Sequence, residues 1–356
     1  MSNKYLTEKI EKIEEYIPNT DEFIIRLDAN ESPFLPSEKV LDSFKKEIDN
    51  IAFDRYPDPF ATELVEKFAE VYGIKSENVV AGNGSDELIS LICSGFCENG
   101  TKVAVAMPDF SMYKFYSGFS GANVIKYQKD ETLKLNLNDF AKMIENNNVK
   151  IAIFSNPCNP TGQIVKKSEL IEFIEKTDAL VIADEAYMEF SDSDESVLGL
   201  VDKYDNLIVL KTLSKAFGSA ALRLGFAVAN REIISAIKKI KSPYNVNTIS
   251  QCFGKIILDN QAEIEEKVSI IKNNVRYLYD KINELNCDAI SKIYDTKTNF
   301  VLVKMKSADD GKKIFEYLKR KKIAIRCMSG GAYLRITAGT IDEIDSVIKE
   351  IEASVK

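Results

Sequence analysis

A lysine lies shortly after one of the most apolar runs of the chain. Residues 207–210 read Leu-Ile-Val-Leu, and Lys215 follows within the segment 212–218, Thr-Leu-Ser-Lys-Ala-Phe-Gly. A side chain at the carboxyl end of a buried strand projects into the crevice where open α/β sheets bind ligands. An amine placed there could act as a nucleophile or a base. A lone Ser-Lys pair is more often an ordinary surface feature, so its meaning depends on the other motifs.

Two segments are suited to binding an anion. Arg223 lies in the sequence Leu-Arg-Leu-Gly-Phe, and a guanidinium flanked by apolar residues needs an anion such as phosphate, whose geometry it matches. Residues 81–88, Ala-Gly-Asn-Gly-Ser-Asp-Glu-Leu, lead from a strand into a helix whose first N–H groups could bind a phosphate. Ser85 and Asp86 also suit an ordinary helix cap, and the glycine spacing is not that of a dinucleotide site.

Three more strand ends carry polar or aromatic side chains. Asp184 and Tyr187 occur in Ile-Ala-Asp-Glu-Ala-Tyr, and Asn156 occurs in the turn-rich loop 155–162, Ser-Asn-Pro-Cys-Asn-Pro-Thr-Gly. Phe110 ends the segment Met-Pro-Asp-Phe, where it could stack on a planar ring or simply pack in the core. The aspartate could cap the next segment, and the loop could be a tight connection. Each motif alone therefore has an ordinary structural explanation.

The five motifs together, in this order and at these spacings, resemble the fold-type I enzymes of the aspartate aminotransferase superfamily, over about residues 28–339. Residues 27–33, Leu-Asp-Ala-Asn-Glu-Ser-Pro, and 55–58, Arg-Tyr-Pro-Asp, are similar to the histidinol-phosphate aminotransferase branch. The resemblance implies a transaminase whose cofactor is pyridoxal 5'-phosphate (PLP). It also implies that Lys215 binds this cofactor covalently and then carries the substrate's α-proton, a role that no histidine could take because the chain has none.

The resemblance also implies a role for each of the other residues around the cofactor. Asp184 would pair with the ring nitrogen, Asn156 and Tyr187 would contact the ring's 3-oxygen, and Phe110 would stack on the ring. The cofactor phosphate would be held by Gly84, Ser85, Asp86, Thr212, Ser214 and Arg223.

A homodimer and a doubly charged substrate follow from the same resemblance. Tyr56 would reach the phosphate of the other subunit, which makes the dimer obligatory. Arg335 resembles the family's substrate-anion arginine, and Arg326 matches a second one, so the pair suits a phosphate or a dicarboxylate. Tyr16 is similar to a lid tyrosine, and Asn30 is placed with the substrate-binding residues. The best prediction is an amino transfer from L-histidinol phosphate to 2-oxoglutarate.

Two departures from the family pattern keep other functions open. Residues 218–222 read Gly-Ser-Ala-Ala-Leu rather than the branch's Gly-Leu-Ala-Gly-Leu, and the stretch between Tyr16 and Asn30 is short. A threonine-phosphate decarboxylase and a broad aromatic aminotransferase are the alternatives. A non-catalytic PLP-binding regulator would need a fused DNA-binding domain, but only about 27 residues precede the first motif. A nucleotide-binding site at Gly82 and Gly84 would leave the lysine and the aspartate unexplained.

Apolar runs separated by helical patterns predict an α/β fold. Strands buried on both faces, as in a mostly parallel sheet flanked by helices, are predicted at 79–82, 102–106, 123–127, 151–154, 180–183 and 207–210. We expect a large PLP-binding domain at 30–240, and a smaller α+β domain made of 1–29 and 241–356. The smaller domain includes an N-terminal arm with a helix at 4–16, a long interdomain helix at 247–285, strands near 300–303, 323–326 and 333–337, and helices at 308–320 and 341–353.

Composition excludes several classes of protein. The net charge of 47 − 55 = −8 argues against a surface that binds nucleic acid. The absence of histidine excludes Ser-His-Asp catalysis and histidine-based metal sites, and none of the six cysteines forms a C-x-x-C pair, so we expect no metal. No stretch has the length and hydrophobicity of a membrane span or a signal peptide, so a cytoplasmic location is expected.

Overall fold

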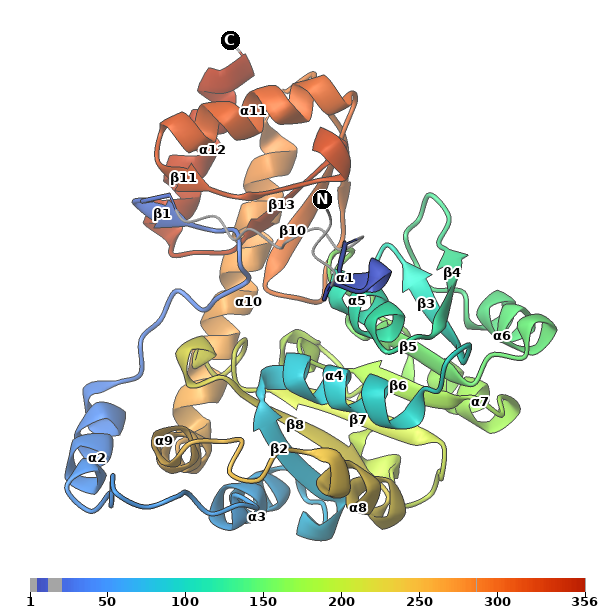
Figure 1. Ribbon diagram of the computed structural model, residues 1–356. Coiled ribbons are helices and arrows are strands. Elements are labelled where there is room, and N and C mark those ends of the chain that lie inside the picture. The colour runs from blue at the N-terminus through green and yellow to red at the C-terminus, as the bar shows by residue number, and fades with distance from the viewer. Residues whose placement is uncertain (1–4, 12–20, 286, 356) are drawn as a thin grey trace.

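The computed structural model describes residues 5–11, 21–285 and 287–355. Figure 1 shows a large α/β part below and a smaller part above, with helix α10 (Gln261–Glu284) running from one into the other. The prediction of one continuous helix at 247–285 is wrong. The helical stretch is interrupted at Asn260, whose φ of −110° and ψ of 47° end α9 (Thr248–Asp259) before α10 begins. No helix among the described residues is long and apolar enough to cross a bilayer.

Seven strands within the described residues form the sheet of the large part, in the order β2-β8-β7-β6-β5-β3-β4. The five strands from β7 to β4 in this order are parallel, whereas β8 is antiparallel to both of its neighbours. The mostly parallel sheet is therefore confirmed, but β8 was missed, because its apolar run was interpreted only as the surroundings of Arg223. The strands are β2 (Val79–Asn83), β3 (Lys102–Met107), β4 (Asn123–Gln128), β5 (Ile151–Ser155), β6 (Leu180–Asp184), β7 (Leu207–Thr212) and β8 (Leu224–Ala229).

Helices cover both faces of this sheet. On one face Leu88 and Ile153 belong to the same buried cluster, and on the other Phe68 stacks on Phe226 at 3.9 Å while Phe140 packs with Phe154. Burial of both faces explains why the strands have consecutive apolar residues rather than an alternating pattern. The first face is covered by α4 (Gly84–Phe96), α5 (Ser111–Phe119) and α8 (Arg231–Ile240), and the second by α3 (Thr62–Tyr72), α6 (Leu137–Asn147) and α7 (Lys167–Lys176).

The smaller part contains a four-stranded antiparallel sheet in the order β12-β13-β10-β9. The strand predicted at 323–326 is in fact two strands in different sheets, because β11 (Ile323–Ala324) pairs with β1 (Ile25–Arg26). Strand β9 was missed. The remaining elements here are β9 (Ile290–Tyr294), β10 (Phe300–Met305), β12 (Arg326–Met328), β13 (Tyr333–Thr337), α11 (Ala308–Arg320) and α12 (Ile341–Val355).

Short helices complete the described elements. They are α1 (Glu8–Glu11), α2 (Glu38–Ile48), and the 3₁₀ turns η1 (Ser76–Asn78), η2 (Met188–Phe190), η3 (Leu198–Leu200), η4 (Ala220–Leu222) and η5 (Ser329–Gly331). Of the helix predicted at 4–16, the structure describes α1 alone, since residues 12–16 lie outside the described ranges. The domain boundaries at 29/30 and 240/241 stay a prediction.

Candidate functional site

Residues at the carboxyl ends of four parallel strands meet at one edge of the large sheet. Asp184 ends β6, Asn156 directly follows β5, and Lys215 and Phe110 each follow the ends of β7 and β3 by three residues. Because neighbouring parallel strands end at the same edge, their following residues share one crevice. The parallel order of the sheet thus explains why these four positions lie close together.

Lys215 is a half-buried amine within this crevice. Its Nζ donates a hydrogen bond to the carbonyl oxygen of Ala29 at 2.9 Å. Burial lowers the pKa of Lys215 to about 8, and the nearby positive charges of Arg335 and Arg223 act in the same direction, against Glu31. A large fraction of the amine is therefore neutral at weakly alkaline pH, which is the form that acts as a nucleophile or base.

The first turn of α4 forms a cradle with two glycines and an arginine. A Cβ atom on Gly225 would lie 2.4 Å from the carbonyl carbon of Gly84 and 2.5 Å from the nitrogen of Ser85. Arg223, at a φ of 51°, crosses the same turn, and a Cβ on Gly84 would lie 2.7 Å from its Nη2. The small residues leave the N–H groups of the helix start next to a guanidinium, which suits a phosphate.

Hydroxyl groups extend this cradle on the side of β7. Oγ1 of Thr212 lies 3.0 Å from Oγ of Ser214, which in turn accepts a hydrogen bond from Nη1 of Arg223 at 3.5 Å. Arg223 also lies 3.6 Å from Asp86, and burial raises the pKa of Asp86 although Arg223 and Lys215 act to lower it. Since a carboxylate repels a phosphate, we expect Asp86 to contribute its backbone N–H only.

Asp184 is a buried carboxylate with a donor on each oxygen. Its Oδ2 accepts from the hydroxyl of Tyr113 at 2.8 Å, and its Oδ1 accepts from the backbone N–H of Ala186 at 3.1 Å. Burial raises the pKa of Asp184 to about 6, and these two hydrogen bonds limit the rise. The group is therefore ionised at neutral pH and can pair with a protonated ring nitrogen. Sequence reasoning missed Tyr113, although its place three residues after Phe110 on a helix was the available signal.

Asn156 and Tyr187 lie beside the crevice, and each makes hydrogen bonds within the chain. The amide of Asn156 pairs with the backbone of Val165, accepting at 2.8 Å and donating at 3.3 Å, which leaves its second N–H for a ligand. The hydroxyl of Tyr187 accepts from Nδ2 of Asn30 at 2.8 Å. Asn30, predicted as a substrate-binding residue, is 1% exposed and is directed to this phenol, so its contact with substrate stays a prediction.

Arg326 and Arg335 lie directly opposite each other in the ladder between β12 and β13. Directly opposite residues place their side chains on the same face of a sheet, and like charges there are unfavourable unless an anion lies between them. Arg335 also donates to Oδ1 of Asn159 at 2.6 Å and to the carbonyl of Asp28 at 2.7 Å, which fix its guanidinium near the crevice.

Two of the predicted site residues are not placed in this cluster by the structure. Tyr56 is 81% exposed and stacks on Tyr244 with ring centroids 4.5 Å apart. This position does not contradict a role in the other subunit. Tyr16 lies outside the described residues.

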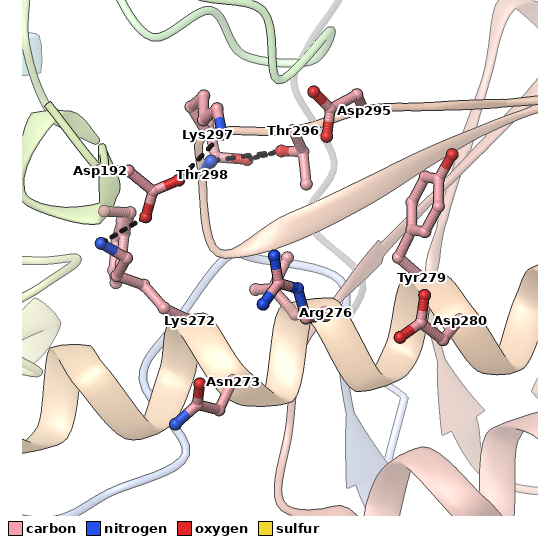
Figure 2. Close-up of a pocket in the computed structure, with 12 residues that line it drawn as sticks. Asp192, Lys272, Asn273, Arg276, Tyr279, Asp280, Asp295, Thr296, Lys297 and Thr298 are labelled. Atoms are coloured by element: carbon pink, nitrogen blue, oxygen red, sulfur yellow. Dashed lines mark hydrogen bonds and ion pairs between the residues drawn. The ribbon is translucent and has the colours of Figure 1, made fainter.

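A separate cleft of about 410 Å³ lies between α10 and the segment that connects β9 to β10. Figure 2 shows that Asp192 bridges its two sides, with ion pairs to Lys272 at 2.7 Å and to Lys297 at 2.9 Å. None of its lining residues was predicted for the site, and its central charges pair with one another. We therefore interpret this cleft as a contact between the two parts of the chain rather than as the catalytic site.

The crevice around Lys215 fits PLP on structural grounds. The two glycines let the start of α4 and the guanidinium of Arg223 pack closely together, which brings helix N–H groups and a positive charge to one place, and Lys215 offers the amine that the aldehyde of PLP requires. Asp184 supplies a buried carboxylate, and Phe110, which is half-buried, packs edge-on against Tyr113 at 5.5 Å. These groups match the phosphate, the aldehyde and the pyridine ring of one ligand.

Comparisons with known proteins agree with this arrangement. The chain is 38% identical to the histidinol-phosphate aminotransferase of Clostridium novyi over 99% of this chain and 98% of that protein. It is 36% identical to the enzyme of the same name from Clostridium kluyveri over 100% of each chain. The histidinol-phosphate aminotransferase of Sinorhizobium meliloti, solved in complex with PLP, has the same fold, with a TM-score of 0.91 at 21% identity over 99% of this chain and 98% of that one.

The sequence pattern described as "Aminotransferase class I and II" matches residues 22–351, which is nearly the whole chain. This match covers every described segment that contributes to the crevice, from the residues around Ala29 to those around Arg335. The chain therefore belongs to the class I and II aminotransferase family, whose cofactor is pyridoxal 5'-phosphate.

Proposed function

We propose that this PLP-dependent transaminase takes the amino group of L-histidinol phosphate and passes it to 2-oxoglutarate. The observation that carries the proposal is the pair Arg326 and Arg335, opposite each other on β12 and β13. Two guanidinium groups on one face suit a dianion, and both substrates contain one: a phosphate in the donor and two carboxylates in the acceptor. The names of the relatives at 36–38% identity support the same substrate.

The chain would hold the cofactor from several strand ends. Bound PLP would supply a carbon that takes up the amino group. Its ring would withdraw electrons from the substrate carbon that loses a proton. Lys215 would hold the cofactor covalently between turnovers, while Arg223 and the start of α4 bind its phosphate. Asp184 would keep the ring nitrogen protonated, because its own pKa of about 6 leaves it negatively charged at neutral pH.

The ε-amine of Lys215 would also move the proton. With the substrate bound beside it, Nζ would be placed to take the proton from the substrate's α-carbon and to give it up again within the site. The chain has no histidine, and the pKa of about 8 leaves far more of this amine in the basic form near neutral pH than the ordinary value of 10.5 would. Tyr187 and Asn156 would orient the ring through its 3-oxygen.

A complete site would require a second subunit. We propose that Tyr56, which is exposed in the single chain, reaches the cofactor phosphate held by the partner in a homodimer. Tyr16 would close over the substrate phosphate. We also propose that the enzyme works in the cytoplasm, where biosynthetic transamination takes place, with small molecules as its ligands and no nucleic acid or membrane as partner.

A coupled assay of glutamate formation tests this function. We expect efficient glutamate formation from L-histidinol phosphate and 2-oxoglutarate, and much weaker activity with an unphosphorylated aromatic amino acid. Negligible activity with histidinol phosphate beside good activity with the aromatic donor would overturn the proposal. Release of CO2 from threonine phosphate, without any need for a 2-oxo acid, would instead identify the decarboxylase alternative.

A further inference from the structure

Lys129 is a lysine that the fold buries almost completely. Its side chain is 1% exposed, and its backbone N–H donates to the carbonyl of Met107 at 2.8 Å, which extends the ladder of β3 and β4 by one residue. Moving an ammonium group out of water costs several kcal/mol unless it is paired and hydrogen-bonded. A lysine in such a place therefore depends on its partners, and those partners indicate what it does.

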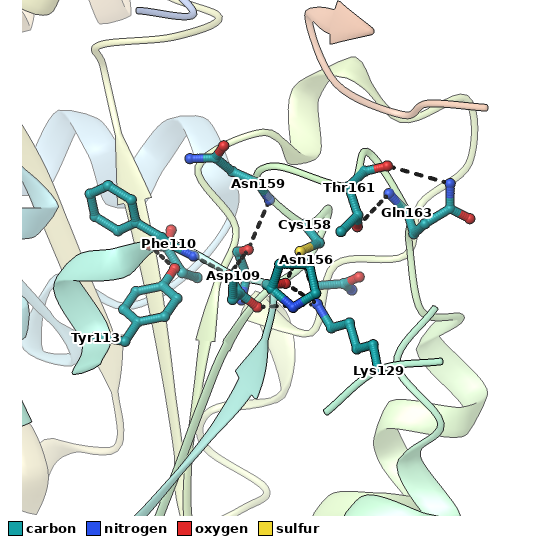
Figure 3. A network of polar contacts seen from close by, with 12 residues as sticks. Asp109, Phe110, Tyr113, Lys129, Asn156, Cys158, Asn159, Thr161 and Gln163 are labelled. Carbon is teal, nitrogen blue, oxygen red and sulfur yellow. Dashed lines mark hydrogen bonds and ion pairs between the residues drawn. The ribbon is translucent and has the colours of Figure 1, made fainter. Parts of the chain in front are cut away.

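The ammonium of Lys129 joins two loops of the cofactor site. Its Nζ donates to the carbonyl of Pro108 at 2.9 Å and to Sγ of Cys158 at 3.1 Å, and it lies 3.5 Å from Oδ2 of Asp109. Pro108 and Asp109 directly precede Phe110, whereas Cys158 belongs to the loop that begins at Asn156. Figure 3 shows these side chains converging between the two strand ends.

Asp109, the partner of Lys129, is hydrogen-bonded to the backbone of both loops. Its carboxylate accepts from the N–H of Phe110 at 2.8 Å, from the N–H of Ser155 at 3.3 Å and from the hydroxyl of Ser155. The same hydroxyl accepts from the N–H of Asn159 at 3.0 Å, and Asn159 binds Arg335. One buried ion pair is thus linked to the residues before the stacking ring and to a substrate arginine.

We propose that Lys129 is a positioning residue of the cofactor site, which acts through its buried ion pair with Asp109. The pair holds the loops of Phe110 and Asn156 in a fixed relation. It also neutralises a carboxylate that would otherwise add a second negative charge beside Asp184. The inference deepens the proposed function, because it rests on the roles proposed there for Phe110, Asn156 and Asp184.

The groups that face Asp184 determine how readily its carboxyl ionises. Tyr113 on α5 and the N–H of Ala186 donate to it, whereas Asp109 after β3 and Asp86 on α4 act as negative charges that raise its pKa. Burial raises the pKa of the Tyr187 phenol, and the charge of the same carboxylate acts in the same direction. A carboxylate at position 109 without its cation would therefore make Asp184 harder to ionise.

The pairing also holds Lys129 in its charged form. Burial acts to lower the pKa of its ammonium, but Cys158 and Asp109 outweigh burial and raise that pKa. Burial raises the pKa of the Asp109 carboxyl, and Lys129 acts in the opposite direction. Removing the lysine alone thus leaves a buried carboxylate without compensation, whereas removing both charges does not.

Four variants test the proposal: Lys129→Met, Asp109→Asn, the double variant, and Lys126→Met as a control with an exposed lysine on β4. The measurement is the affinity of each apo-protein for PLP, by fluorescence titration between pH 5 and pH 9. We expect Lys129→Met to bind PLP roughly 10-fold more weakly at pH 7. In a plot of PLP affinity against pH, the fall in affinity on the acid side (the acid limb) should begin at a higher pH than in the wild type. The double variant should recover most of both effects, and Lys126→Met should match the wild type.

The outcomes separate positioning from a general loss of stability. If Lys129→Met does not fold, Asp109→Asn carries the test, because the loss of this charge should move the acid limb to lower pH than in the wild type. The inference is wrong if Lys129→Met folds and binds PLP with an unchanged affinity and acid limb. It is also wrong if the double variant is no closer to the wild type than Lys129→Met. A wild type that binds no PLP would refute the proposed function itself.

Discussion

Arg326 is the residue on which the choice of substrate depends most. It lies opposite Arg335, which Asn159 and the carbonyl of Asp28 hold in place, so a dianion bound there would meet both guanidinium groups. We expect Arg326→Gln to lower kcat/KM for L-histidinol phosphate by about 10- to 100-fold, since a hydrogen bond to a charged group contributes roughly 1.5–3 kcal/mol. An unphosphorylated aromatic donor should lose much less.

Steady-state kinetics with both donors check this prediction, and Arg320→Gln, at the exposed end of α11, is the matched control. Equal losses for both donors would mean that Arg326 does not recognise the phosphate.

The pKa of Lys215 predicts how cofactor binding depends on pH. Burial and two arginines lower it to about 8 from the ordinary 10.5, and only the neutral amine attacks the aldehyde of PLP. The rate at which the apo-protein attaches PLP should therefore rise with pH, with a midpoint near 8, and level off above it. Stopped-flow absorbance measures this rate. A rate that is still rising at pH 10 would show that the lysine is not perturbed.

At the residue scale, sequence could predict the groups that follow strand ends but not the contacts that orient them. Lys215 and Asp184 were identifiable because each follows an apolar run within a recognisable motif. The donation from Tyr113 to Asp184 and the burial of Lys129 could not be read in the same way. Both join segments whose proximity depends on the order of strands in the sheet, which the motifs do not specify.

At the element scale, Asp192 connects α10 to the segment between β9 and β10. Its two lysine partners, Lys272 and Lys297, lie on these two elements, and their hydrogen bonds lower the pKa of Asp192 to about 2. Because the Asp192 side chain is 63% exposed and solvent weakens both ion pairs, we expect Asp192→Asn to reduce the free energy of unfolding by about 1 kcal/mol or less.

The pH dependence of this effect has a definite sign. A carboxyl whose pKa is depressed in the folded state stabilises it fully above its ordinary value of 3.8, and this stabilisation is lost as the pH falls toward about 2. Urea denaturation of both proteins at pH 7 and at pH 3 tests this. The difference between wild type and variant should shrink at the lower pH, and a difference that grows there would contradict the assignment.

The elements themselves were predicted unevenly. Strands β3, β5, β6 and β7 were recognised because residues buried on both faces give uninterrupted apolar runs. Strand β4 lies at the edge of the sheet and is only partly buried, but its β-branched and aromatic residues still indicated a strand. Strand β8 was missed because it follows Arg223 directly and returns antiparallel, without the intervening helix that marks the other strands. The break at Asn260 was missed because the apolar spacing of α9 continues into α10.

At the scale of the whole molecule, the proposed homodimer would complete each site with Tyr56 of the other chain, and this tyrosine is exposed in the single chain. We expect Tyr56→Phe to weaken PLP binding, and mixing it with inactive Lys215→Ala subunits should restore function. Random reassortment makes half of the dimers hybrid, and each hybrid has one intact site, so about a quarter of the sites should recover. Measurement of PLP affinity and activity after unfolding and refolding the mixture tests this, and no gain over the unmixed variants would place Tyr56 in its own subunit's site.

Borohydride reduction shows whether Lys215 holds PLP covalently, because it converts a reversible link between an amine and an aldehyde into a stable one. The purified protein should absorb visible light, lose this absorption on reduction, and carry the cofactor's mass on the peptide that contains Lys215. Lys215→Ala should show neither the absorption nor the label, whereas the exposed Lys126→Met should show both. A label on another lysine, or a wild type that takes up no PLP at all, would contradict the account.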